Sequence, residues 1–174
     1  MRWRWIAGGL AAAALAVAAF NWFSAMSPLQ AALSDDPRNK ELSIWAYHRL
    51  GVLPGELVFD VRDLGPGNSA NDVLRTLLQY ARAQKDSSFE HVTLAYRGEA
   101  RFQIDGRYFS KLGTEYGYQN PIYTLRTMPE NLYRPSGRRA YESWTGGLLG
   151  VTARQMEDLS DFTGDWFMRD ETRR

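Results

Sequence analysis

The residues of this chain best suited to acid–base chemistry are three carboxylates, Asp60, Asp63 and Glu115. Two of them fall within one alternating segment, and the third lies well beyond it in the sequence. Catalysis by paired carboxylates needs no local motif, because the two groups only have to converge in a cleft. The sequence therefore allows a small hydrolase that uses these carboxylates, although it does not show that they meet.

A second candidate site is aromatic and lies in the segment KLGTEYGYQNPIYTLRTMPENLY, residues 111–133. Its tyrosines would form a wall, its amides would donate and accept hydrogen bonds, and its arginine would attract a polar or acidic ligand. The alternative is a turn-rich connection whose rings cover a sheet. The candidate ligand- or partner-binding residues are Tyr116, Tyr118, Gln119, Asn120 and Arg126.

Other kinds of catalytic site lack their residues. The chain has no cysteine, which excludes thiolate nucleophiles and zinc–cysteine centres. It has two histidines, His48 and His91, and no G-x-S-x-G or H-E-x-x-H motif. We therefore expect no metal site and no cofactor, and we expect the protein not to be an enzyme unless its carboxylates converge.

The charge balance argues against a nucleic-acid partner. The chain carries 21 basic and 20 acidic residues, and the basic excess disappears once Arg2 and Arg4 at the amino terminus are set aside. Binding to nucleic acid needs clustered basic residues. Short basic pairs such as Arg138-Arg139 do not form such a cluster.

The amino terminus has the pattern of an export signal over residues 1–28. Arg2 and Arg4 precede an uncharged apolar run from Ile6 to Phe20, and the first acids come at Asp35-Asp36. The small residues of Val17-Ala18-Ala19 would suit cleavage by signal peptidase. An uncharged stretch of about 20 residues flanked by tryptophans also suits a transmembrane anchor with its positive end in the cytoplasm. We expect an inner-membrane anchor with the domain facing the periplasm or the outside, or a secreted domain if this segment is cleaved.

Residues 29–37 are expected to be a linker and residues 38–174 a single extracytoplasmic domain. Hydrophobic periodicity and capping signals predict its elements. The pattern from Leu29 to Leu50 is helical with a break at Asp35-Asp36-Pro37, where Asp36-Pro37 predicts the start of the helix that runs to Leu50. Ser69 with Asp72 predicts a capping box. The expected elements are a helix over 38–50, a strand over 56–64, a helix over 69–84, a hairpin of 92–96 with 100–104, a short helix over 108–112, a strand over 122–127 and a terminal amphipathic helix from Thr152.

This order of elements predicts an α/β fold, with α+β as the alternative. It would have a small mixed sheet of about four strands, a βαβ-like crossover helix, a C-terminal amphipathic helix and an N-terminal hydrophobic helix. We expect a membrane-tethered or exported binding or envelope-assembly module that contacts the membrane through its N-terminal segment and a protein partner in the envelope. The alternative is the carboxylate hydrolase.

Overall fold

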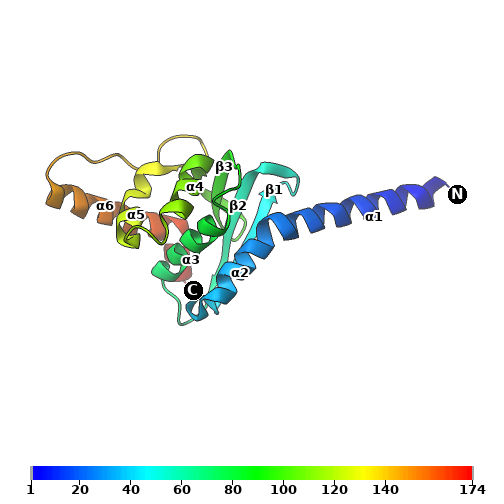
Figure 1. Cartoon of the computed structure of the whole chain (residues 1–174), viewed down its shortest axis with the longest axis horizontal. Coiled ribbons are helices and arrows are strands. Elements are labelled where there is room, and N and C mark those ends of the chain that lie inside the picture. Colours follow the sequence, from blue (N-terminus) through cyan, green and yellow to red (C-terminus); the bar gives the residue numbers. More distant parts are fainter. Residues whose placement is uncertain (1, 174) are drawn as a thin grey trace.

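The fold is mixed α/β, built on one five-stranded sheet (Figure 1). A computed structural model describes the backbone of residues 2–173, and the side chains of residue 6 and residues 8–173. The strands lie in the order β1-β2-β3-β4-β5, and only the β2–β3 pair is parallel. Their bounds are β1 Leu42–Arg49, β2 Leu53–Leu64, β3 His91–Tyr96, β4 Glu99–Asp105 and β5 Leu132–Tyr133.

Helix α3 (Ala70–Ala83) connects the two parallel strands, as the predicted βαβ crossover requires. At its start the Asp72 carboxylate accepts hydrogen bonds from the Ser69 backbone N–H at 2.7 Å and the Ser69 hydroxyl at 2.8 Å. The hairpin of β3 and β4 is also confirmed. The sheet has one strand more than the four expected, because Leu132 and Tyr133 pair with β4.

The helices pack on the face of the sheet that carries Phe59. The ring of Phe59 lies 5.8 Å from Tyr80 of α3 and 6.0 Å from Trp166 of the π-helical turn η4 (Gly164–Met168), between ring centroids. The other helical elements of the C-terminal part are α4 (Gly106–Glu115), α5 (Pro121–Thr127), η3 (Pro129–Asn131), α6 (Leu148–Thr163) and α7 (Arg169–Glu171). Burying such large rings supplies most of the stabilisation of a small core.

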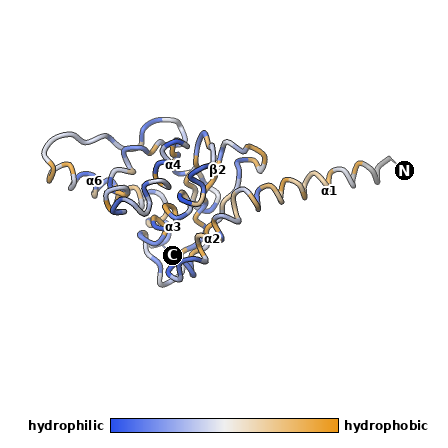
Figure 2. Tube along the Cα trace, in the orientation of Figure 1, coloured by the Kyte–Doolittle hydropathy of each residue, from blue (hydrophilic) through white to orange (hydrophobic). Residues whose placement is uncertain are grey.

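The N-terminal segment is a long helix that projects away from the domain (Figures 1 and 2). It consists of α1 (Arg2–Asn21), the π-helical turn η1 (Trp22–Met26) and α2 (Ser27–Asp35), and a short helix η2 (Pro37–Asn39) follows. Gly8–Asp35 is long and apolar enough to cross a membrane, a test that a signal sequence also passes. The apolar residues of α1 are mostly exposed, whereas Ala25 and Leu29 are fully buried in the core.

The long helix is fastened to strand β1 and to the turn that follows it. The Asn21 side chain accepts a hydrogen bond from the His48 N–H at 2.8 Å and donates one to the Gly51 carbonyl at 2.7 Å. The Phe20 ring stacks on the His48 ring with 4.7 Å between centroids. Two side chains of α3 add to this junction, because Tyr80 and Gln84 donate to carbonyls of η1 at 3.0 and 2.7 Å.

Two predicted elements were wrong in type. The helix expected over 38–50 is strand β1, in which Leu42, Ile44, Ala46 and His48 are buried and alternate with more exposed residues. The strand expected over 122–127 is helix α5, because Asn120 caps it by accepting from the Ile122 N–H at 3.1 Å. Asparagine at the N-cap followed by proline at the first helical position is a helix start that overrides the strand preference of Ile122 and Tyr123.

Two boundaries also differ from those expected. The terminal helix α6 begins at Leu148, so Thr152 lies inside the helix and does not cap it. The segment expected to be a linker, residues 29–37, forms most of α2 and the start of η2, and it contributes Leu29 to the hydrophobic core. The apolar helix therefore continues into the folded domain without a flexible connection.

The junction predicts a pH dependence of stability. Burial lowers the pKa of His48, so the folded state favours the neutral ring. The unfolded chain takes up this proton first as the pH falls below the ordinary histidine pKa of about 6.5, and the stability contributed by the neutral ring is then lost. Urea unfolding of the full chain in detergent, at a pH above and a pH below this value, should show a smaller acid-induced loss for His48→Gln than for the unsubstituted chain. His91→Gln, at the exposed start of β3, is the matched control and should lose as much stability as the unsubstituted chain.

Candidate binding groove

The five residues of the predicted aromatic site lie in different surroundings. Asn120 caps α5, and Tyr118 is 90% exposed. Arg126 lies over the Tyr123 ring at 4.5 Å and donates to the Thr152 hydroxyl at 3.1 Å, so it joins α5 to α6. The backbones of Tyr116 and Gln119 pair with each other.

Of these five residues, Tyr116 alone lines a hollow of about 740 Å³, and the rest of its lining comes from α3 and from residues 31–38. Arg82 lies 5.9 Å from the Tyr116 ring. The structure therefore does not gather the predicted aromatic residues around one cavity. A ligand role for them stays a prediction.

Asp60 is fully buried and serves to join strands. Its carboxylate accepts from Arg62 at 2.9 Å, from the Gly98 backbone N–H at 3.0 Å and from the Tyr47 hydroxyl at 3.3 Å. Burial raises the pKa of Tyr47 to about 12, and the negative charge of Asp60 adds to this. The Asp60 side chain is 0% exposed, and a carboxylate closed off in this way offers little to a substrate.

The other two candidate carboxylates have different partners. Asp63 binds Arg97 at 2.9 Å on the turn after β3. Glu115, at the end of α4, accepts from Thr124 at 3.4 Å and lies 3.6 Å from the Lys111 ammonium. The contacts of Asp60 and those of Glu115 involve different residues, and convergence of the three carboxylates stays a prediction.

Ser24 and His48 form a pair that resembles a nucleophile and its base. The Ser24 hydroxyl lies 2.8 Å from His48 Nε2. The same hydroxyl donates to the Phe20 carbonyl at 2.6 Å, so it accepts from the ring and is not deprotonated by it. This pair therefore ties the long helix to β1, and it does not have the arrangement of an activated serine.

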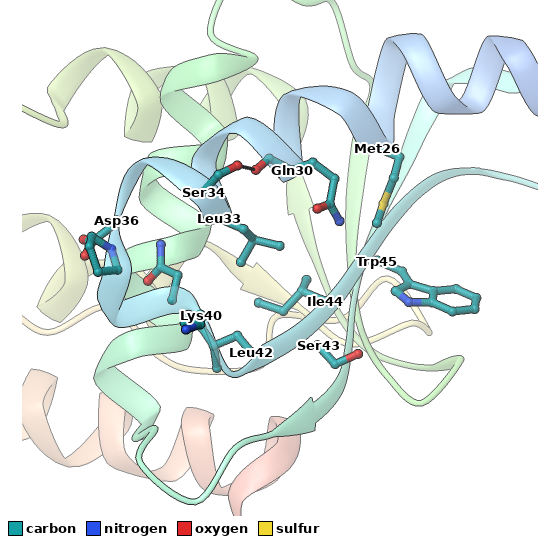
Figure 3. Close-up of a pocket in the computed structure, with 12 residues that line it drawn as sticks. Met26, Gln30, Leu33, Ser34, Asp36, Lys40, Leu42, Ser43, Ile44 and Trp45 are labelled. Carbon is teal, nitrogen blue, oxygen red and sulfur yellow. Dashed lines mark hydrogen bonds between the residues drawn. The ribbon is translucent and has the colours of Figure 1, made fainter.

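A groove of about 550 Å³ lies between α2 and the edge strand β1 (Figure 3). It is lined by Met26 at the end of η1, by Gln30 and Leu33 of α2, and by Ile44 and Trp45 of β1. In Figure 3 the Gln30 and Leu33 side chains of α2 point toward the strand, the Ile44 side chain points toward the helix, and the Trp45 ring points away from the helix. Trp45 is 53% exposed, with Arg62 over its ring at 5.0 Å.

The backbone of β1 faces this groove with unpaired groups. Strand β1 is at the edge of the sheet, and its regular pairing with β2 runs from Ile44 to His48. The His48 N–H points outward, to Asn21. Because N–H groups alternate between the two edges of a strand, those of Ile44 and Ala46 point outward as well. Among the residues that the structure describes, the hydrogen bonds outside the sheet ladder do not involve the Ile44 or Ala46 backbone.

Charged and polar residues close the far end of the groove, where α2 turns into η2. Hydrogen bonds from Arg38 hold the pKa of Asp36 well below its usual range. Arg75 of α3 lies 3.2 Å from the same carboxylate, and Gln79 donates to it at 3.1 Å. Asn39 is buried and donates to the Ala32 carbonyl at 3.2 Å. This network links the end of α2 and the η2 turn to α3 at this end of the groove.

Comparisons with protein-family models, with curated proteins and with solved structures find no match to this chain. Within the residues whose side chains are described, no group of three or more acidic or histidine side chains could hold a metal ion. Function must therefore be argued from the groove and from the long helix.

The groove was missed in the sequence because β1 was predicted as a helix. A helix over 38–50 would satisfy its own backbone hydrogen bonds and would have no sheet edge. The alternation of Leu42, Ile44 and Ala46 was the signal that could have revealed it.

We predict a structural role for Asp60. Asp60→Asn should lower the free energy of unfolding by about 1–3 kcal/mol, because it weakens a buried hydrogen-bonded charge. Asp63→Asn, at a carboxylate that is 58% exposed, should cost about 0–1 kcal/mol. Urea unfolding of the full chain in detergent measures both. Equal small effects would contradict the assignment of Asp60 as a joint between strands.

Proposed function

We propose that this protein is a membrane-anchored, non-catalytic binding module that captures an extended segment of a partner protein in the groove beside β1. The observation that carries the proposal is the outward-facing backbone of Ile44 and Ala46 alongside a groove that is lined by both apolar and polar side chains. An extended peptide that pairs with such an edge gains main-chain hydrogen bonds, and its alternate side chains enter adjacent pockets. The open strand edge and the adjacent groove, which these two kinds of contact need, lie on the same surface.

The side chains of the groove define the segment that it would accept. Leu33 and Met26 provide an apolar wall, and the buried core residue Ile44 provides the floor. On the other side of the strand, the exposed ring of Trp45 would cover residues of the bound segment that point away from α2. A partner strand with apolar residues at alternate positions fits this arrangement.

The long helix would place the groove at a membrane surface. The groove begins at Met26, immediately after Trp22 and Phe23, which are 52% and 74% exposed. Arg2 and Arg4 at the other end would remain cytoplasmic by the positive-inside rule, so the domain would face the periplasm or the outside. A partner held here would be another envelope protein, and the protein would act in envelope assembly.

An edge strand left open is a hazard for aggregation, and proteins usually protect it. Here the outward N–H of His48 donates a hydrogen bond to the Asn21 side chain, and this bond protects only one end of β1. The remaining edge lies beside a formed groove, as a docking site requires.

A proline substitution tests the proposal at one backbone position. Ala46→Pro removes an N–H that is not needed for the pairing with β2, and proline is tolerated on edge strands at such positions. Peptides selected from a displayed library of extended sequences, using the full chain in nanodiscs, should bind at least about tenfold more weakly to Ala46→Pro, because a main-chain hydrogen bond and the close approach are lost.

Ala46→Gly keeps the N–H and is the matched control, so it should retain binding. Amide hydrogen exchange should slow at Ile44 and Ala46 when a selected peptide binds. Equal affinity for a folded Ala46→Pro variant, or protection confined to another surface, would overturn the proposal.

A further inference from the structure

The turn between β1 and β2 has an unusual residue at its tip. Leu50 and Gly51 both have positive φ, +54° and +75°, and the Val52 N–H bonds to the Arg49 carbonyl at 3.3 Å. Two consecutive positive φ angles define a type I′ turn, which favours Asn, Asp or Gly at its first central position. Leucine is strained in this conformation, because its Cβ crowds the backbone.

The turn between β3 and β4 provides a comparison within the same chain. There Arg97 and Gly98 also have positive φ, and the Arg97 side chain binds Asp63 and Glu171. The strain at Arg97 is therefore accompanied by contacts inside the domain. Leu50 is instead 80% exposed, so its side chain gains little from the protein itself.

Leu50 is one of several exposed apolar residues near the point where the long helix leaves the domain. Val52 is 54% exposed and Leu53 36%, and on the helix Trp22 and Phe23 are exposed as well. Figure 2 shows the tip of this hairpin as a hydrophobic segment beside the helix. Exposed apolar residues gathered in this way mark an interaction surface.

The depth of the tip along the helix follows from its contacts. A Cβ added to Gly51 would lie 3.3 Å from the Val17 side chain, and the Gly51 carbonyl accepts from Asn21. Val17 precedes Trp22 by five residues, which is about 7–8 Å along a helix. If Trp22 lies at the membrane interface, where tryptophan is favoured, the turn lies deeper than this ring.

We propose that the tip of the β1–β2 hairpin inserts into the lipid bilayer beside α1 as a second membrane contact. This inference rests on the proposed role of α1 as a membrane anchor. The occupant is the bilayer because the apolar tip lies at the same level as the exposed apolar part of α1. Arg49 flanks the tip and is bound to Glu56 at 2.7 Å. Its long side chain can keep the charge at the interface while the tip enters the lipid.

Two membrane contacts would fix the orientation of the domain relative to the bilayer, which one contact leaves free. A single helix allows the domain to rotate and tilt, whereas a helix and a hairpin that both enter the bilayer define one orientation. The groove beside β1 would then be held at a constant distance from the membrane, because β1 leads directly from the groove to the tip.

The absence of cysteine from the chain allows a spin label to be placed at single positions. The full chain is reconstituted in nanodiscs of a phosphatidylcholine and phosphatidylglycerol mixture, with a label at Leu50→Cys, at Ala14→Cys in the middle of α1, or at Gly67→Cys beyond the opposite end of β2. Accessibility to oxygen and to a water-soluble nickel chelate is then measured. Lipid raises accessibility to oxygen and lowers accessibility to nickel, whereas burial by protein lowers both.

The label at Leu50 should show the lipid pattern, like the label at Ala14 and unlike the label at Gly67. Leu50→Asn, which suits the turn better, should restore nickel accessibility to a label at Val52→Cys. A lipid pattern at Ala14 with an aqueous or protein-buried pattern at Leu50 would overturn this inference and leave the anchor in place. An aqueous pattern at Ala14 would overturn the anchor itself. A Val52 label that stays protected in Leu50→Asn would show that Leu50 does not drive insertion.

Discussion

One continuous helix combines an exposed apolar part with a part that is buried in the core of the domain, and the rest of the structure depends on this constraint. Its first part carries exposed apolar residues, and its last part carries Ala25 and Leu29, which are fully buried between α3 and the sheet. The two parts could be separated by a flexible linker, but Asn21, Ser24 and the turn at Gly51 join them to β1. The domain is therefore an extension of the helix, and its position follows the helix.

The same fastening determines where β1 is left open. Asn21 satisfies the outward N–H of His48, and α2 then runs beside the strand at a distance that leaves the groove between them (Figure 3). The buried network around Asp36 holds the other end of α2 against α3. The groove is thus bounded by two fixed points of one helix, and its shape does not depend on a mobile loop.

The elements that were predicted correctly have strong local signals. The capping box of Ser69 and Asp72 and the apolar stripe of α3 identify one element regardless of its neighbours, and the Arg97-Gly98 turn identifies the hairpin. In β1 the residues Leu42, Trp45 and Ala46 fit the period of a helix, while Leu42, Ile44 and Ala46 fit that of a strand. The last buried residue of the strand is the polar His48, which interrupts the alternation of apolar residues. The local pattern therefore could not distinguish a helix from a strand. The groove forms between elements that are close in sequence. Predicting it depends on assigning β1 as a strand, and because the local pattern does not decide this, the groove could not be predicted.

The π-helical turn η1 explains how the helix keeps one face toward the domain along its whole contact. Val17, Asn21, Ala25 and Leu29 are four residues apart, and in a regular α-helix each such step would drift by about 40° around the axis. A wider turn over Trp22–Met26 takes up part of this drift. Within the same turn, the carbonyls of Ser24 and Ala25 accept hydrogen bonds from Gln84 and Tyr80. The extra residue in this turn therefore sets the rotation, about the helix axis, between the exposed part of the helix and the buried part. This rotation determines the direction in which the domain faces around the axis of α1.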